Sequence, residues 1–322
     1  MTSLAEIAWW CSGTLGQPWR WEYRPLVGVW VLVAALGITY ARALRRHAAE
    51  AGGEHAPATR HYAWRFGAGL ALLVVSSDWP LGPLGAGYLA SIAALRTLLL
   101  TFGVAPLLLL GTPPWMLRRL LRTGPPDTTE PPGRLLRFAR TVTQPWVAFL
   151  VFNAMLVVTQ LPPVVDTLKL TQLGSFALDG AWLVASIIMW VPLLRPLPEL
   201  GGLDDPMRLV YLFGLSIVPT VPASFLTFSR FPLYRLYELA PRVVPSLDAV
   251  VDQQMAGLGL KIGGGIILWS VMTVLFFRWA AGEQPDAVPT VSWSQFERDL
   301  ERYDLRHRRE QPPPPPPPTT PT

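Results

Sequence analysis

Long apolar runs alternate with short polar segments along most of the chain. The seven runs are 26–43, 64–80, 86–110, 145–161, 173–194, 207–228 and 254–278. Each is close to the roughly 20 residues with which an α-helix crosses the hydrocarbon core of a bilayer. Only helices and closed barrels satisfy the backbone in lipid, and runs of this length lack the alternation of barrel strands. The pattern predicts an all-α membrane protein, a bundle of seven transmembrane helices.

The loops between these runs carry unequal amounts of positive charge. Most lysines and arginines fall in the segments 41–65, 112–144, 195–208 and the tail after 277. Basic loops stay in the cytoplasm, so the bias predicts an N-terminus outside and a C-terminus inside. It also explains the net charge of +5 without a nucleic-acid partner, and it makes the lipid bilayer the expected surroundings.

The organisation has three parts: an N-terminal segment over 1–25, the bundle over 26–280 and a cytoplasmic tail over 281–322. The start, MTSLAEIAWW, lacks the basic region of a cleavable signal peptide. We expect it to form an interfacial helix with Trp9 and Trp10 at headgroup depth.

Amphipathic helices are also expected on both membrane surfaces. Residues 112–144 contain two basic amphipathic stretches separated by a proline-rich turn, typical of helices on an anionic leaflet. Residues 229–253 are too polar to span and indicate a short interfacial helix. The PTVP sequence at 219–222 predicts unwound backbone inside the sixth run.

The tail combines an amphipathic helix with a proline run. A charged helix over 292–309 would place four apolar side chains in one stripe, Trp293, Phe296, Leu300 and Tyr303. Pro312 to Pro318 form an uninterrupted polyproline II segment. Nothing within the tail covers the stripe, so we expect the tail to bind another integral membrane subunit.

Several polar side chains lie inside or at the ends of the spans, all in the predicted outer half. They are Arg96, Asp179, Lys261, Asp78, Asp252, Gln160 and Gln172. Charges in a membrane are costly and indicate a function or a partner, so we expect Arg96 to pair with Asp179 or Asp78. Three roles stay open for this buried polar cluster: an ion-pair network that fixes packing, a site for a ligand or a partner's side chain, and a proton path.

Three stretches of the chain resemble the CtaG family of bacterial membrane proteins, which is associated with cytochrome c oxidase assembly. They are residues 64–115, which contain APLLLLGTPPW, residues 144–166, which begin QPWVAF, and residues 247–262, which contain LDAVVDQQMAGL. The resemblance implies a multi-pass protein of the bacterial inner membrane. It also implies copper handling, because family members carry histidines at these motifs.

This chain departs from the family at the histidine positions. The aligned residues are Ala93, Thr97, Thr159, Gln160 and, near the start of the fifth span, Gln172. All four histidines, His47, His55, His61 and His307, fall in predicted cytoplasmic segments. The single cysteine, Cys11, excludes a Cys-pair metal motif. We therefore expect no copper and no other cofactor, with lipid or pigment in surface grooves left open.

The sequence carries no Walker loop, dinucleotide fingerprint or HExxH helix, so we expect a protein without enzymatic activity. The first hypothesis is a CtaG-like structural or assembly subunit of a bioenergetic membrane complex that lacks the copper site. That complex would be a respiratory oxidase or a photosynthetic reaction-centre complex. The alternatives are an active assembly factor that handles copper and a small-solute transporter that uses the polar cluster.

Overall fold

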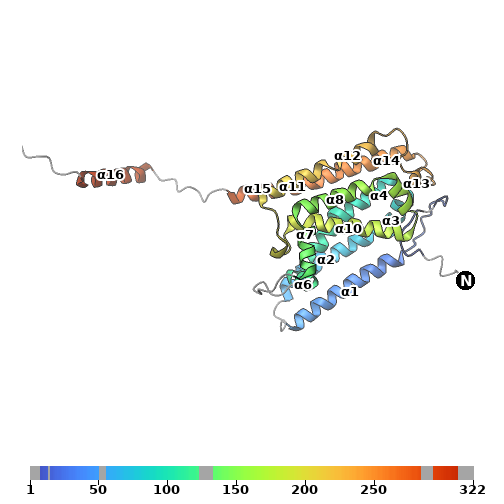
Figure 1. Ribbon diagram of the computed structural model, residues 1–322, viewed down its shortest axis with the longest axis horizontal. Coiled ribbons are helices and arrows are strands. Elements are labelled where there is room, and N and C mark those ends of the chain that lie inside the picture. The colour runs from blue at the N-terminus through green and yellow to red at the C-terminus, as the bar shows by residue number, and fades with distance from the viewer. Residues whose placement is uncertain (1–7, 14, 51–55, 123–132, 284–292, 311–322) are drawn as a thin grey trace, which may run out of the picture. The chain divides into compact units, whose positions relative to one another are not determined.

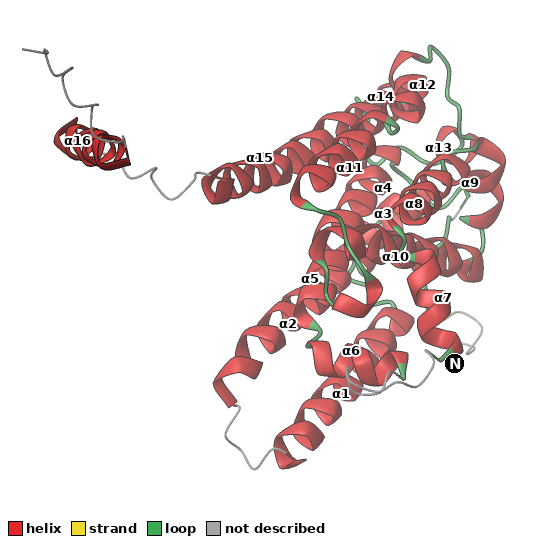
Figure 2. Cartoon of the chain, turned by 60° about the vertical axis from the view of Figure 1, so that its left-hand side comes forward, coloured by secondary structure: helices red, strands yellow, loops and turns green. Residues whose placement is uncertain are grey.

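The computed structural model describes residues 8–13, 15–50, 56–122, 133–283 and 293–310. Every regular element in these ranges is a helix, as Figure 2 shows. The chain divides into two units, residues 1–276 and 277–322. The all-α fold class predicted from the sequence is confirmed for the described residues.

The first half of the chain supplies the helices from α1 to α8. They are α1 (Val27–Glu50), α2 (Ala56–Ser77), α3 (Leu81–Gly87), α4 (Ala90–Leu98), the π-helix η2 (Leu99–Val104), α5 (Ala105–Gly111), α6 (Pro114–Leu121), α7 (Arg134–Val142) and α8 (Pro145–Thr159). Proline occupies the first turn of α6 and α8, where its missing N–H has no partner to lose.

The second half continues with shorter elements between three long helical segments. They are α9 (Pro162–Leu168), α10 (Gln172–Leu194), the 3₁₀-helix η3 (Pro198–Leu200), α11 (Asp205–Ile217), α12 (Thr220–Phe228), α13 (Arg235–Glu238), α14 (Ala249–Leu258), the π-helix η4 (Gly259–Gly263), α15 (Gly264–Glu283) and α16 (Trp293–Glu310). The side chain of Thr171 accepts from the Gly174 amide and fixes the start of α10.

Five helical segments are long and apolar enough to cross a membrane. They are Val27–Glu50, Ala90–Gly111, Gln172–Leu194, Asp205–Phe228 and Ala249–Gly282. A sixth candidate is the pair α7 and α8, which is bent by 70°. The α8 helix alone has 15 residues, or about 22 Å, which is short of the hydrocarbon thickness. The seventh expected span corresponds to α2, whose first half carries Arg60, His61 and Arg65. The predicted apolar runs are therefore helical, and the count of seven spans stays a prediction.

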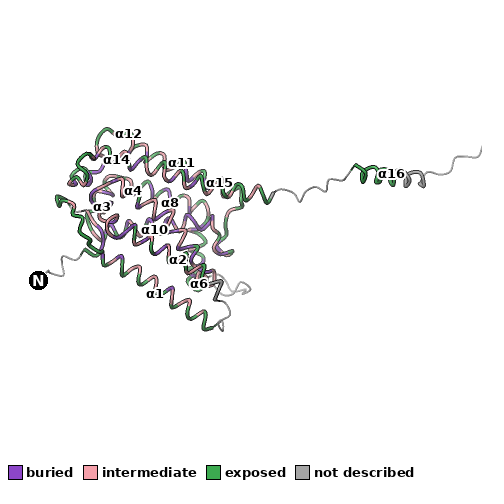
Figure 3. The backbone as a smooth tube through the Cα atoms, turned by 180° about the vertical axis from the view of Figure 1, so that it is seen from behind, coloured by how far each residue is buried: buried purple, intermediate pink, exposed green. Residues whose placement is uncertain are grey.

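The central helices of the bundle differ from the peripheral ones in burial. Half of the most apolar 18 residues are buried in Ala90–Gly111 and in Gln172–Leu194, against 11% in α1 and in Ala249–Gly282. Figure 3 shows the same contrast along the tube. The largest core cluster surrounds α10, where Met189 is fully buried against neighbours such as Leu212. The exposed faces of α1 and α15 are apolar, as expected for lipid contact.

Three spans contain breaks in their α-helical geometry. The break at Val218–Pro219, between α11 and α12, includes only the first residue of the PTVP sequence, and the other three residues are helical, so the backbone is less unwound than expected. The π-helices η2 and η4 interrupt the third and last candidate spans and were not expected. Both π segments supply residues to one cavity, described below.

The connecting segments gather at two ends of the bundle. At one end the Gly13 amide donates to the backbone carbonyl of Lys169, and the side chain of Asp166 of α9 accepts from the Leu236 amide of α13. At the other end Arg118 of α6 pairs with Glu199 at 2.8 Å. Figure 1 places α3 and α13 near the N-terminal end and α6 at the opposite one. Loops predicted to share a membrane side therefore share an end of the molecule, whereas which end faces the cytoplasm stays a prediction.

Two segments that were expected to form interfacial helices bury side chains in the protein. Most of the predicted N-terminal helix, residues 1–7, lies outside the described residues, whereas residues 8–13 are not helical and Trp10 is buried in the protein, 2% exposed. In the predicted 229–253 segment the expected short helix is present as α13, but its Leu236 and Tyr237 are buried in the bundle. Both segments fold inward because their aromatic and apolar side chains find partners on α9, α10 and α14.

The tail expectations lie partly within the described residues. The helix α16 is present, and its stripe of Trp293, Phe296, Leu300 and Tyr303 is exposed. Pro312 and Pro318 lie outside the described residues.

Candidate functional site

A buried ion pair joins the third span to α10. Arg96, in α4, is 5% exposed, and its Nη2 atom lies 2.8 Å from Oδ2 of Asp179. Its Nε atom donates to the carbonyl oxygen of Ser76 at 2.7 Å. Two charges removed from water need each other and further hydrogen bonds to offset their lost hydration. The pairing of Arg96 with Asp179 is one of the two expected from the sequence.

The N-terminal segment completes the surroundings of this ion pair. The indole Nε1 of Trp10 donates to Oδ2 of Asp179 at 3.0 Å, and Sγ of Cys11 lies 3.6 Å from Nη2 of Arg96. The side chain of Gln172 holds the segment in place by accepting from the amides of Trp9 and Trp10 at 3.0 and 3.3 Å. Burial raises the pKa of Cys11 to about 11, so the thiol is neutral near pH 7.

A cavity lies beside the ion pair, with about 60 Å³ of space open to water-sized molecules. We call it the polar cavity, and its walls include Ala93, Arg96, Thr97, Gln160, Lys169 and Asp179. Four of the candidate spans contribute to it, together with the end of α8, the segment from α9 to the start of α10 and the region around α13. It therefore collects residues that lie far apart in the sequence.

Lys169 is the second cation of the polar cavity. Its Nζ atom donates to the hydroxyl of Tyr237 at 2.7 Å, and that hydroxyl donates to the carbonyl of Gly85 at 2.7 Å. Burial, followed by the charge of Arg96, lowers the pKa of Lys169 to about 8. In the described part of the chain no carboxylate lies within ion-pair distance of Nζ.

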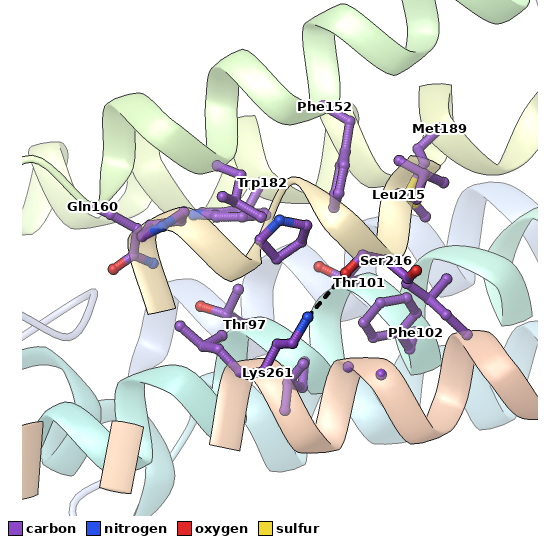
Figure 4. Close-up of a pocket in the computed structure, with 18 residues that line it drawn as sticks. Thr97, Thr101, Phe102, Phe152, Gln160, Trp182, Met189, Leu215, Ser216 and Lys261 are labelled. Carbon is purple, nitrogen blue, oxygen red and sulfur yellow. Dashed lines mark hydrogen bonds between the residues drawn. The ribbon is translucent and has the colours of Figure 1, made fainter. Parts of the chain in front are cut away.

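A second, mainly apolar cavity of about 40 Å³ shares Thr97, Gln160 and Trp182 with the first. We call it the apolar cavity, and Figure 4 shows its lining from Gln160 and Trp182 at one side to Met189 and Leu215 at the other. The side chain of Lys261 reaches across it, hydrogen-bonded to the hydroxyl of Thr220 and 3.5 Å from the carbonyl of Ser216. Lys261 is an exposed residue in the structure, so the expectation that it belongs to a buried cluster with Arg96 is wrong.

Asp78 and Asp252 also lie apart from the ion pair, although both are 2% exposed. Asp78 accepts from the Leu26 amide at 2.8 Å and from the Trp30 indole at 2.9 Å, at the start of α1. Asp252 accepts from the Ala90 amide at 2.6 Å and from Ser91, at the start of α4. Each carboxylate thus satisfies backbone N–H groups at the start of another helix and interacts favourably with its dipole.

The predicted cluster is therefore divided into four separate groups. Three are the single residues Lys261, Asp78 and Asp252, and the fourth surrounds the ion pair. Arg96 and Asp179 touch, Gln160 lines the same cavity, and Gln172 is linked to the pair through the Trp10 segment. The side-chain oxygen of Gln160 does not contact the ion pair and accepts instead from the hydroxyl of Tyr234 at 2.9 Å.

Sequence reasoning missed four members of the site, namely Trp10, Cys11, Lys169 and Tyr237. Each was assigned to a loop or to the membrane interface. A signal for Lys169 was its position three residues before Gln172 in a short connection, since such a connection leaves a cation close to the polar end of the fifth span. No comparable signal marks Tyr237.

These features define a multi-pass helical membrane protein with a polar cavity between its central helices. Residues 38–282 match the profile of the cytochrome c oxidase caa3 assembly factor family, Caa3_CtaG. The match covers well over half of the chain, so the protein belongs to this family, and the resemblance found in the sequence is confirmed. No curated protein and no solved structure shows significant similarity to the chain.

Proposed function

We propose that the protein acts in the assembly of a cytochrome c oxidase as a non-catalytic, structural component of the bacterial inner membrane. Family membership supports the assembly role, and the five candidate spans support a position among other integral membrane subunits. The lipid bilayer would surround the exposed apolar faces of α1 and α15.

The residues at the aligned histidine positions do not fit copper. The side chain of Ala93 has no atom that could bind a metal ion, and the Thr97 hydroxyl donates a hydrogen bond to the Ala93 carbonyl at 3.0 Å. The side-chain oxygens of Gln160 and Gln172 already accept hydrogen bonds from Tyr234 and from the Trp9 and Trp10 amides. Copper favours imidazole and thiolate ligands. Among the described residues no group of three or more His, Cys, Asp or Glu side chains could hold a metal ion.

The observation that carries the proposal is the placement of these positions. Ala93, Thr97 and Gln160 all line the polar cavity. A cavity thus remains where the family resemblance would place histidines, and a buried ion pair stands beside it. We infer that the chain keeps the family scaffold and has lost its copper chemistry.

Elemental analysis of the purified protein tests this loss. We expect well under one copper per chain after a chelator wash, because the cavity offers no pair of soft ligands. The Ala93→His, Thr97→His double variant is the matched control, since it restores an i, i+4 pair on one helix face and should retain more copper. Stoichiometric, chelator-resistant copper in the unmodified protein would contradict the proposal.

Co-purification in mild detergent tests the partner. An oxidase partner should bring haem absorption with the protein, whereas bacteriochlorophyll absorption would redirect the proposal to a reaction-centre complex. Recovery of the chain alone at every detergent and salt concentration would contradict a subunit role.

A further inference from the structure

The polar cavity holds more positive than negative charge. Two cations, Arg96 and Lys169, face one carboxylate, that of Asp179, which Arg96 already binds. The buried carboxylate of Asp252 is not part of the cavity wall and accepts from the Ala90 and Ser91 amides. An unbalanced cation in a partly apolar cavity favours a bound anion.

Hydrogen-bond donors in the cavity wall exceed the acceptors available to them. In the described structure the Nη1 atom of Arg96 and the Nε2 atom of Gln160 have no hydrogen-bond partner, and Nζ of Lys169 uses one of its three protons. The nearby hydroxyls of Tyr234 and Tyr237 donate elsewhere, to Gln160 and to the Gly85 carbonyl. A guest that only accepts hydrogen bonds would complete this set.

The dimensions of the cavity limit the size of such a guest. About 60 Å³ of space open to water-sized molecules holds roughly four or five waters. A carboxylate of three or four heavy atoms occupies similar space. Trp182 and Leu178 form apolar parts of the wall and strengthen charge-assisted hydrogen bonds by excluding water.

We propose that the polar cavity binds a small monovalent anion of the size of formate or acetate, through Lys169, the free edge of Arg96 and the amide of Gln160. This site goes beyond the assembly role and does not depend on it. The presence of copper or of an oxidase partner would leave the anion prediction unchanged.

Calorimetric titration of the detergent-purified protein with sodium formate tests the site, with gluconate as the balancing salt. We expect saturable binding to the unmodified chain and a loss of affinity of about tenfold or more in Lys169→Gln, which removes a charge-assisted donor. Lys261→Gln is the matched control, because it removes the same charge from the apolar cavity, and it should bind formate unchanged. Acetate should compete with formate.

Affinity should also fall above about pH 8, as Lys169 loses its proton. The groups that act on Lys169 electrostatically are Arg96, Asp179 and Cys11, and Tyr237 is its hydrogen-bond partner. Of these, the thiol is neutral up to about pH 11, so its ionisation lies well above this range.

Two results would overturn the proposal. One is the absence of saturable formate and acetate binding to the unmodified protein. The other is equal affinity in folded Lys169→Gln. If Lys169→Gln does not fold, Gln160→Leu replaces it as the test variant, because it removes the amide donor without changing the charge. Unchanged formate affinity and unchanged acetate competition in Gln160→Leu would then overturn the proposal.

Discussion

Arg96 is the residue on which the buried site depends most. It binds a carboxylate, a backbone carbonyl and a thiol from three separate segments, and 5% of it is exposed. Such a charge is tolerated only while its partners stay in place. The ion pair therefore couples α4, α10 and the N-terminal segment.

A double-mutant cycle tests this coupling. Arg96→Ala and Asp179→Ala should each lower the free energy of unfolding by about 3–5 kcal/mol, because each strands a buried charge. The double variant should cost clearly less than the sum. Denaturation in detergent measures the three values.

Asp78→Ala provides the control for the cycle. Asp78 is buried but bonds to Leu26 and Trp30, so its effect should add to that of Arg96→Ala. Equal coupling of Arg96 to both aspartates would show that the cycle reports general loosening of the bundle.

The ion pair was accessible from the sequence, and the rest of the site was not. Arg96 and Asp179 stand out because charges in apolar runs need partners. Trp10, Cys11 and Lys169 lie in irregular segments, whose path is fixed by tertiary hydrogen bonds with no periodic pattern. Asp252 was misplaced for a related reason, since nothing in the sequence shows that it binds the start of α4.

At the scale of elements, hydrophobic runs located the helices and prolines located one break. The π-helices η2 and η4 escaped prediction because one extra residue in a turn leaves the apolar composition unchanged. The α7–α8 bend follows from Pro145, which cannot continue a helix from the preceding turn. Composition thus predicts where a helix runs better than how it bends.

The element α16 carries a prediction of its own. Truncation after Gly282 should leave the bundle folded and weaken co-purification with the partner complex, because the exposed apolar stripe of α16 would be lost. Replacing Trp293 and Leu300 by serine should have the same effect without shortening the chain. Glu301→Gln, on the polar side of the helix, is the control. Undiminished recovery through detergent and salt washes would show that the tail is a passive extension.

At the scale of the molecule, the two ends of the bundle carry different sets of loops. The end with α6 and α7 is rich in arginine, and the end with α9 and α13 holds the cavity's lysine and the N-terminal segment. From the positive-inside rule we predict that the arginine-rich end faces the cytoplasm.

Single cysteines labelled with a membrane-impermeant maleimide test this orientation. Ser246→Cys should react in intact cells and Thr141→Cys only after permeabilisation, and both positions are exposed. The native thiol should stay silent, since Cys11 is 2% exposed and its pKa is raised to about 11. A Cys11→Ser background verifies that silence, and the reverse labelling pattern would refute the orientation.

The contacts of the N-terminal segment can form only late in the biosynthesis of the bundle. The Trp9 amide donates to Gln172, which lies 163 residues further along the chain. Arg96 pairs with Asp179, which lies 83 residues after it. At a synthesis rate of about 5–20 residues per second, Trp9 waits roughly 8–30 seconds for Gln172 to be synthesised. The segment around Trp9 is thus synthesised well before it can reach its final place, and an unpaired arginine must be accommodated by the insertion machinery until α10 arrives.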